Sequence, residues 1–158
     1  MTKIMFVCHG NICRSPMAEF IFKDLIKKNG RESDFFVKSS ATSTEEIWNG
    51  IGNPVYPPAR QELNKHDISC ENKRAIQLTK EDYEKYDLFI CMDSNNLRNA
   101  ERIFGIDKDN KLHKLLEYCG ETTDVSDPWY TDRFDVAYSD ILEGCEALFE
   151  QITDKEIK

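Results

Sequence analysis

Near its start the chain reads Ile4-Met5-Phe6-Val7-Cys8-His9-Gly10-Asn11-Ile12-Cys13-Arg14-Ser15-Pro16, an apolar run followed by the beginning of a helical pattern. Residues 3–8 predict a buried strand, and Pro16 fits the first turn of the helix that follows, where a missing N–H costs nothing. A turn from a strand into a helix N-terminus directs backbone N–H groups inward, and such a cup binds a phosphate-like dianion. The stretch therefore predicts an α/β domain with an anion site after its first strand.

Two side chains of this loop carry chemistry. Cys8 is expected to be a thiolate, because the loop N–H groups, Arg14 and the positive end of the helix dipole all favour negative charge there. Arg14 offers a planar fork of donors that matches two phosphoryl oxygens. Ser15 can donate its hydroxyl to the Cys8 sulfur, while Gly10 and Asn11 allow close approach or positive φ. The loop thus predicts a nucleophile directed at phosphorus.

The remaining loop positions are expected to bind phosphate through their backbone. For His9 we expect a side chain at the pocket rim, with only its N–H used. The predicted phosphate-binding positions are His9, Gly10, Asn11, Ile12, Cys13 and Ser15.

Length and composition indicate one domain over residues 1–158. Apolar residues make up 40% and charged residues 32%, with no apolar run long enough to span a membrane, so neither a membrane segment nor disorder is predicted. The first strand begins almost at once and leaves no room for a signal peptide, so we expect a cytoplasmic protein with its six cysteines reduced. Their spacing matches no paired zinc motif, and no metal is expected.

The net charge of −8 argues against some partners. Nucleic acids and anionic membranes reward clustered lysine and arginine, so neither is predicted. A small site built of backbone dipoles and one arginine still attracts an anion locally. The charge is therefore compatible with a phosphate ligand.

Strand and helix patterns alternate along the chain, which indicates a mostly parallel sheet. A polar stretch at 39–44 and a long irregular segment through 53–54 interrupt them. Ligands bind outside the carboxyl ends of such strands, which is where the Cys8 loop lies. The predicted strands cover residues 3–8, 35–37, 88–92 and, as a strand or short turn, 111–116; the predicted helices cover 18–28, 58–65, a stretch from 79, a stretch from 93, and 134–152.

A second motif, Asp127-Pro128-Trp129-Tyr130, precedes the last helix. Hydrolysis of a phosphate monoester through a covalent intermediate needs an acid for the leaving group as well as a nucleophile. Asp127 is a candidate, because the proline stiffens its segment and the two aromatic residues can wall a pocket deep enough for an aryl ring. One aspartate among 29 acidic residues is otherwise an ordinary surface charge.

With these two motifs the sequence resembles the low-molecular-weight protein tyrosine phosphatase family over nearly its whole length. Residues 7–16 match the family pattern V-C-x-G-N-x-C-R-S-P, and residues 127–130 match its late Asp-Pro-aromatic-Tyr motif. The resemblance implies a small Rossmann-like three-layer domain, with a central four-stranded parallel sheet, helices on both faces and the phosphate-binding loop between the first strand and the first helix. It also implies that no metal or organic cofactor is used.

The resemblance implies a cysteine-dependent phosphoric monoester hydrolase. Cys8 would form a phosphocysteine intermediate, Arg14 would clamp the phosphate, and Asp127 would act first as acid and then as base. The implied substrates are phosphotyrosine-containing proteins or small aryl phosphates, with inorganic phosphate as product, and we expect a monomer. The implied supporting residues are Asn11, Ser15 and Ser39 for the loop, and Trp48, Trp129 and Tyr130 for the specificity wall.

Two further residues, Lys73 and Cys13, are expected to act on the loop or within it. Many family members have a histidine supporting the loop asparagine, and Lys73 is the nearest equivalent here. As loop support it can donate to the Asn11 carbonyl, but a charged point donor needs solvent or an acid nearby. Cys13 has two interpretations. It is either a small buried apolar residue or, as the resemblance suggests, a redox partner that forms a reversible disulfide with oxidised Cys8.

Three alternatives to a tyrosine phosphatase stay open. An arsenate reductase would relay a disulfide through further cysteines such as Cys70 and Cys91, but it has no need of Asp127. A phosphoarginine phosphatase is a second alternative, although its relatives tend to carry threonine where this loop has Ile12, and an apolar side chain suits an aryl ring better. A non-catalytic phospho-ligand binding module is the third, and it would have no use for the Cys8 nucleophile.

Overall fold

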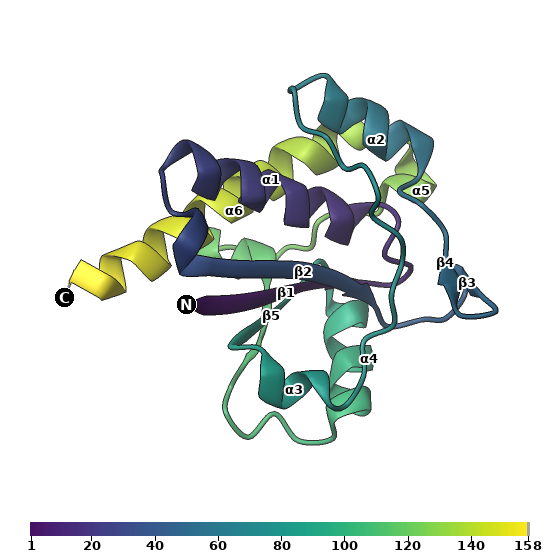
Figure 1. Ribbon diagram of the computed structural model, residues 1–158. Helices are drawn as coiled ribbons and strands as arrows, with labels where there is room; N and C mark the ends of the chain where they lie inside the picture. Colours follow the sequence, from purple (N-terminus) through teal and green to yellow (C-terminus); the bar gives the residue numbers. More distant parts are fainter. Residues whose placement is uncertain (158) are drawn as a thin grey trace.

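A four-stranded parallel sheet with strand order β2-β1-β5-β6 forms the centre of the computed structural model, which describes residues 1–157 (Figure 1). The order reverses direction at β1, because the chain first pairs β2 on one side of β1 and then β5 on the other. Ligands bind at such a switch point, beyond the carboxyl ends of the strands. The strands are β1 (Thr2–Cys8), β2 (Phe35–Ala41), β5 (Leu88–Cys91) and β6 (Leu112–Lys114).

Helices cover both faces of this sheet, so the predicted three-layer fold is confirmed (Figure 1). On one face lie α1 (Arg14–Lys28), α2 (Pro57–Asn64), α5 (Pro128–Thr131) and α6 (Phe134–Ile157). On the other lie α3 (Asp82–Lys85) and α4 (Ser94–Phe104). No helix within residues 1–157 is long and apolar enough to cross a membrane.

The first strand divides its side chains between two hydrophobic cores. Ile4 and Phe6 belong to the core that includes α1 and α6, whereas Met5 and Val7 belong to the smaller core that includes α4. Alternate residues of a strand point to opposite faces of the sheet, so a strand covered on both faces reads as a continuous apolar run. This arrangement explains the apolar stretch before Cys8.

The second strand is longer than the sequence indicates. It was predicted over residues 35–37, but it continues through the polar residues to Ala41, with Ser39 paired beside Phe6. Both Ser39 and Ser40 are fully buried. A buried serine is tolerated where its hydroxyl finds a partner, and the Ser39 hydroxyl finds two near the phosphate-binding loop.

The segment expected to be irregular contains a small hairpin, β3 (Ile47–Trp48) and β4 (Ile51–Gly52). The two strands are joined by Asn49 and Gly50, whose φ angles of 51° and 76° are those of the two-residue turns that favour Asn-Gly. The prediction of an irregular segment is therefore wrong at this point, because Asn49 and Gly50 form a two-residue hairpin turn.

Other boundaries shift by a few residues. The helix predicted from 79 reduces to the four residues of α3, and the strand or turn predicted over 111–116 is β6 followed by a 3₁₀ helix, η2 (Leu115–Cys119). A second 3₁₀ helix, η1 (Glu32–Asp34), precedes β2. The last helix extends five residues past the predicted end at 152. None of these differences moves the elements that carry the two motifs.

Candidate active site

The loop between β1 and α1 presents backbone donors to an open pocket. Asn11 has a φ of 59°, and the carbonyl of Ile12 is held by the N–H of Tyr56 at 2.9 Å. In the part of the chain that the structure describes, the N–H groups of His9, Gly10, Ile12 and Cys13 have no protein acceptor. The α1 helix also begins without a side-chain cap. These unpaired donors form the cup that the sequence predicts.

Cys8 lies at the floor of the cup and is 3% exposed. Its sulfur is 2.9 Å from the Ser15 hydroxyl and accepts the N–H of Asn11 at 3.3 Å. Hydrogen bonds to sulfur favour the thiolate, which is the nucleophilic form of cysteine. The predicted contact between Ser15 and Cys8 is present.

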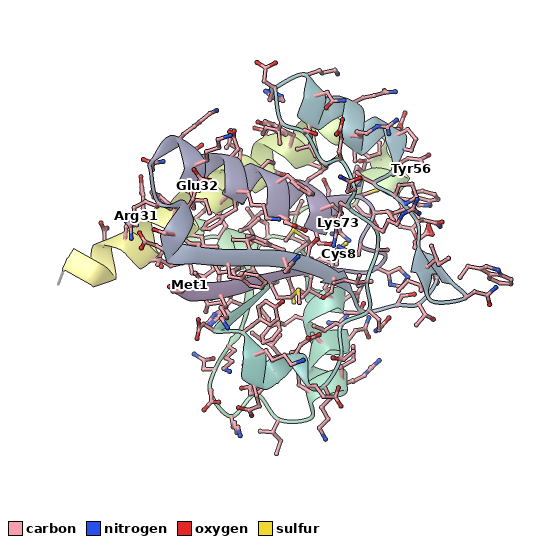
Figure 2. All side chains as sticks on the ribbon, viewed as in Figure 1. Met1, Cys8, Arg31, Glu32, Tyr56 and Lys73 are labelled. Atoms are coloured by element: carbon pink, nitrogen blue, oxygen red, sulfur yellow. The ribbon has the colours of Figure 1, made fainter. Side chains whose placement is uncertain are left out.

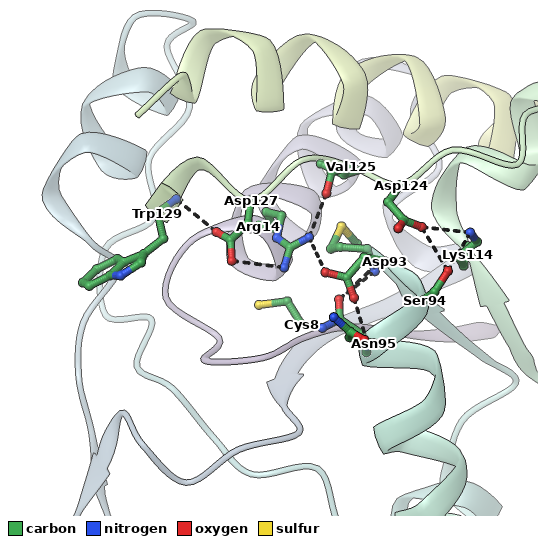
Figure 3. A network of polar contacts seen from close by, with 12 residues as sticks. Cys8, Arg14, Asp93, Ser94, Asn95, Lys114, Asp124, Val125, Asp127 and Trp129 are labelled. Atoms are coloured by element: carbon green, nitrogen blue, oxygen red, sulfur yellow. Dashed lines mark hydrogen bonds and ion pairs between the residues drawn. The ribbon is translucent and has the colours of Figure 1, made fainter. Parts of the chain in front are cut away.

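The guanidinium of Arg14 is buried between two carboxylates (Figure 3). Its Nη1 pairs with Asp93 at 2.8 Å and donates to the carbonyl of Val125 at 2.8 Å, while its Nη2 is 3.5 Å from Asp127. Burial alone would lower the pKa of Arg14, but the charges of Cys8, Asp93 and Asp127 outweigh it and raise the pKa. Arg14 is thus a fixed cation beside the Cys8 sulfur.

Asp93, which the sequence does not single out as a site residue, makes two contacts at the site. One carboxylate oxygen accepts the N–H of Asn96 and caps α4, and the other pairs with Arg14. The available signal was its place directly after a buried strand, at the edge of the sheet where the Cys8 loop also lies. Nothing in the sequence separates it from the other acidic residues by type.

Asp127 reaches the same place from the far end of the chain. Its Oδ1 accepts the N–H of Trp129 at 3.0 Å and so caps the short α5 helix, while its Oδ2 faces Arg14. The carboxylate is partly exposed. Figure 3 shows it beside Arg14 and near Cys8, with Trp129 projecting to the side.

These groups line a pocket of about 230 Å³, which also brings together most of the predicted rim. Trp129 and Tyr130 line it with exposed fractions of 55% and 85%. Two acidic residues that the sequence analysis missed, Glu45 and Glu46, line it as well. The lining residues are Cys8, His9, Gly10, Ile12, Cys13, Arg14, Glu45, Glu46, Asp127, Trp129 and Tyr130.

Among the described residues that line this pocket, Trp48 is absent, so the structure contradicts its predicted place in the wall. It sits beside the turn of the β3–β4 hairpin and is 79% exposed. The reason is the hairpin itself. The Asn49-Gly50 turn carries Trp48 away from the sheet, whereas Glu45 and Glu46, just before the hairpin, remain at the pocket.

The structure also shows where the predicted loop residues Gly10 and His9 lie relative to Glu46 and Glu45 at the pocket rim. A Cβ added to Gly10 would lie 3.2 Å from Cγ of Glu46, so the glycine permits close approach, and it does so without positive φ. His9 is half-exposed at the pocket and its Nε2 is 3.0 Å from a carboxylate oxygen of Glu45. The rim position predicted for His9 is therefore the one it occupies.

Asn11 holds the loop through a buried network. Its amide nitrogen donates to the hydroxyls of Ser15 at 2.7 Å and Ser39 at 2.9 Å, and its Oδ1 accepts the N–H of Ile76 at 3.0 Å. The predicted contact of Lys73 with Asn11 is wrong, because the Ile76 backbone occupies that acceptor. Lys73 instead donates to the carbonyl of Ser39 at 2.9 Å.

The residue that Lys73 pairs with, Glu19, is also one that the sequence analysis missed. Glu19 is almost fully buried in α1; its Oε1 accepts the Ser39 hydroxyl at 2.6 Å and lies 3.6 Å from the Lys73 ammonium. Burial lowers the pKa of Lys73, and the charge of Glu19 opposes this shift. Lys73 therefore supports the loop indirectly: it contacts Ser39 and Glu19, and Ser39 in turn accepts a hydrogen bond from Asn11 of the loop.

The other cysteines differ from Cys8 in their surroundings. Burial, and then the nearby charge of Cys8, raises the pKa of Cys13 to about 12. Cys70 and Cys91 are buried, and neither lines the pocket within the described residues. The same part of the chain contains no group of three or more His, Cys, Asp or Glu residues placed to hold a metal ion.

The fold and this site are those of the small cysteine-dependent phosphatases. The family described as low molecular weight phosphotyrosine protein phosphatase matches residues 3–158 of the chain. Low molecular weight protein-tyrosine-phosphatase YfkJ of Bacillus subtilis is 36% identical over 154 residues, which is 96% of each chain. Low molecular weight phosphotyrosine protein phosphatase of Gallus gallus is 36% identical over 155 residues, or 94% of each chain. The chain therefore belongs to the low molecular weight phosphotyrosine protein phosphatase family.

Solved structures resemble the fold over almost its full length. The crystal structure of YfkJ from Bacillus subtilis aligns with a TM-score of 0.91 at 34% identity, covering 98% of this chain and 96% of that one. A structure of YwlE arginine phosphatase, a Cys-to-Ser mutant with a phosphorylated active-site serine, aligns with a TM-score of 0.84 at 29% identity and covers 96% of each chain. The same fold thus carries at least two named activities.

Proposed function

We propose that the chain is a protein tyrosine phosphatase that hydrolyses phosphotyrosine monoesters through a phosphocysteine intermediate. The observation that carries the proposal is the meeting of Cys8, Arg14 and Asp127 in one pocket, although Asp127 comes from the opposite end of the sequence. Nucleophile, cation and acid are the three groups that this reaction requires.

The substrate phosphoryl group binds in the cup between β1 and α1. The unpaired N–H groups of the loop contact its oxygens, and Arg14 supplies two parallel donors and a positive charge. Asp93 holds the guanidinium in this orientation before substrate arrives. Because the donors are already oriented, little reorganisation is needed as charge shifts onto the oxygens in the transition state.

In the first step the Cys8 thiolate attacks phosphorus in line with the ester oxygen. An S–P bond forms, the P–O bond to the tyrosine ring breaks, and its electron pair goes to the phenol oxygen. Asp127 protonates that oxygen, so the product leaves as a neutral phenol. The enzyme is left as phosphocysteine with Asp127 ionised.

In the second step water hydrolyses the S–P bond of phosphocysteine. Asp127 accepts a proton from the water, whose oxygen forms a P–O bond as the S–P bond breaks. The Ser15 hydroxyl, 2.9 Å from the sulfur, stabilises the departing thiolate. Inorganic phosphate is released and the starting protonation of Asp127 is restored.

The wall of the pocket supports an aromatic ester. Trp129 and Tyr130 stand on one side, and Ile12 contributes an apolar surface near the floor. Aromatic side chains pack favourably against a phenyl ring in offset or edge-on arrangements. A phosphotyrosine side chain is also long enough to bring its phosphate to a buried sulfur.

Hydrolysis of phosphoarginine is a second candidate function, which one observation favours. Glu45 and Glu46 line the pocket and offer carboxylates to a guanidinium leaving group. The structural resemblance to YwlE arginine phosphatase supports the same alternative. The apolar side chain of Ile12 in the pocket lining favours an aryl ester, and for that reason phosphotyrosine remains our main proposal.

Two other activities have less support. An arsenate reductase would relay a disulfide through further cysteines, and Cys70 and Cys91 are buried outside the pocket lining of the described chain. Cys13 does line the pocket, but burial raises the pKa of its thiol to about 12. A non-catalytic binding module would not require Asp127 opposite the thiol. We further propose one catalytic domain, residues 1–158, acting as a cytoplasmic monomer without metal or cofactor. A single chain supplies the pocket, and a catalytic thiol needs reducing conditions.

A substrate panel tests this proposal. Peptides bearing phosphotyrosine, phosphoserine or phosphoarginine are compared by kcat/KM, with arsenate plus thiol as a separate assay. We expect the highest kcat/KM with phosphotyrosine. A preference for phosphoarginine would transfer the assignment to the second candidate, arsenate reduction would indicate a reductase, and failure to turn over any of them would indicate a binding module.

A further inference from the structure

A second cavity, of about 280 Å³, lies between α2 and residues 70–74. Among the described residues it shares no lining side chain with the catalytic pocket. Lys73, one of its lining residues, donates to the carbonyl of Ser39 in β2, and Figure 2 labels Lys73 and Cys8. The lining residues are Pro54, Val55, Arg60, Cys70, Glu71, Asn72, Lys73 and Arg74.

The cavity is cationic in a protein that is strongly anionic. Three basic residues line it, Arg60, Lys73 and Arg74, against one carboxylate, Glu71, whereas the chain as a whole has a net charge of −8. Clustered cations repel one another, and an anion bound between them removes that repulsion. Because Lys73 is paired with Glu19, the charge that a bound anion would neutralise is that of the two arginines.

Two of these cations lack a partner charge. Within residues 1–157 neither Arg60 nor Arg74 has a carboxylate at ion-pairing distance, although Arg14 pairs with Asp93 and Arg133 with Asp135. Arg74 donates from Nη1 to the carbonyl of Gly52 at 2.9 Å, which fixes the side chain and leaves its other donors available. Arg60 is exposed on α2 and makes no side-chain hydrogen bond in the described part of the chain.

The third cation, Lys73, has a different role at the cavity wall. Its side chain is only 8% exposed, and its ammonium is already bonded to the Ser39 carbonyl and paired with Glu19. It adds positive potential to the cavity but few free donors. Recognition of an anion thus depends on the two guanidinium groups, whose planar forks match the geometry of phosphate oxygens.

We propose that this cavity is a second anion site, which binds a phosphate-sized oxyanion between the guanidinium groups of Arg60 and Arg74. Its volume is near the lower end of ligand sites, which suits inorganic phosphate or a small phosphate ester. Both ligands present the same chemistry, a tetrahedral dianion. The site has no nucleophile directed at phosphorus, because Cys70 is buried and burial raises the pKa of its thiol.

The test is titration calorimetry on enzyme whose catalytic pocket is blocked. Benzylphosphonate, a non-hydrolysable aryl ligand, is added to saturation, and its own stoichiometry is measured first. Inorganic phosphate and glycerol phosphate are then titrated separately. We expect one further equivalent of either anion to bind, and the tighter of the two identifies the source of the oxyanion.

Two matched variants assign the site. Arg60→Gln removes one guanidinium from an exposed helix position, and we expect it to weaken the second binding event about tenfold or more, as loss of a charge-assisted contact does. Arg102→Gln, an equivalent change on α4 on the other face of the sheet, should leave binding unchanged. Circular dichroism verifies that both variants are folded.

Two results would overturn the proposal. One is the absence of any phosphate or glycerol phosphate binding to wild-type enzyme that holds a single equivalent of benzylphosphonate. The other is an affinity in Arg60→Gln that equals the affinity in Arg102→Gln. If benzylphosphonate itself binds with two equivalents to wild type and one to Arg60→Gln, the second site is confirmed directly.

Discussion

The phosphate-binding loop and the aromatic rim belong to one pocket but are built in opposite ways. In the loop, Asn11, Arg14 and Ser15 are almost completely buried, and each is fixed by hydrogen bonds or ion pairs to other elements. At the rim, Trp129 and Tyr130 are largely exposed to solvent. The loop is therefore fixed by its buried hydrogen bonds and ion pairs, while the rim is held by few contacts.

This difference separates two tasks. A phosphoryl group is the same in every substrate, so its donors can be fixed in advance, and fixed donors stabilise a transition state better than flexible ones. The groups attached to the phosphate vary, and exposed aromatic side chains can adapt to them at low cost. The comparison predicts that changes in the loop affect chemistry strongly and that changes at the rim affect substrate choice more modestly.

The largest effect is expected where the loop loses its nucleophile. Cys8→Ser should lower kcat for aryl phosphates by about 10⁵-fold or more, because an unactivated hydroxyl is a much poorer nucleophile. Phosphate binding should persist, since the backbone donors and Arg14 remain. Steady-state kinetics and calorimetry measure the two properties. Cys119→Ser, at a partly exposed cysteine outside the pocket, serves as control, and an equal loss there would contradict the assignment.

Removal of the acid tests the contribution of the distant loop. Asp127→Ala should slow aryl phosphate hydrolysis about 10²- to 10⁴-fold, the usual range for general acid catalysis. Asp127 also caps α5, so Asp127→Asn separates the two roles. The amide oxygen still accepts the Trp129 N–H, but the side chain cannot protonate a phenol.

We expect Asp127→Asn to be as slow as Asp127→Ala. Asp124→Ala provides the matched control, because Asp124 lies on the same loop but pairs with Lys114 at 2.8 Å instead of with Arg14. Wild-type turnover in Asp127→Asn would remove Asp127 from the acid role and leave it only the cap.

The support of the loop can be broken without touching the reacting groups. Asn11→Ala removes two buried hydrogen bonds and one partly buried one and places alanine at a positive φ, so the free energy of unfolding should fall by about 2–4 kcal/mol. Asn49→Ala has the same backbone cost in the exposed hairpin, about 1 kcal/mol, without the network. Urea unfolding measures both, and equal losses would show that the network contributes nothing.

A smaller effect is expected at the rim. Trp129→Ala should raise KM for aryl phosphates about twofold to tenfold, because a half-exposed aromatic contact is worth roughly 0.5–1.5 kcal/mol. Trp48→Ala, an identical change outside the pocket lining, should stay within about twofold of wild type. A larger effect of Trp48→Ala would restore Trp48 to the wall and reverse this part of the comparison.

The smallest effect concerns the second thiol of the loop. A pKa raised to about 12 keeps the Cys13 thiol protonated throughout the range from pH 6 to pH 9, and only the thiolate is alkylated efficiently. Iodoacetamide should therefore modify Cys8 and leave Cys13 unmodified at every pH in that range, as peptide mass spectrometry can measure. Rapid alkylation of Cys13 at pH 7 would contradict the assigned environment.

The sequence predicted the parts of the site whose geometry is local. The backbone donors, the Cys8 sulfur and Arg14 all lie in or at the ends of the loop between β1 and α1. Their arrangement therefore follows from a strand, a loop and a helix in succession. Asp127 was predicted from its neighbours Pro128 and Trp129. The strands over residues 3–8 and 88–92 were also predictable, because a strand that is buried on both faces of a sheet appears in the sequence as an apolar run.

The parts that were missed depend on contacts between distant segments. Glu19 and Asp93 look like ordinary acidic residues until the fold brings them to Ser39 and Arg14. Lys73 was expected at Asn11, but the main chain of Ile76 reaches that acceptor first. The sequence does not show which of two nearby residues in one segment will reach the Asn11 carbonyl, so this level of detail required the structure.

The separation of Cys8 and Asp127 along the chain has a consequence for biosynthesis. The cup and its thiol are translated first, but Arg14 is held by the carbonyl of Val125 and α1 shares its core with α6, so the cup depends on elements that are translated last. The acid follows only with the loop before α5 and α6. A chain that ends before that loop would lack both Asp127 and the Val125 carbonyl that holds Arg14, so the site is complete only after almost the whole sequence has been synthesised.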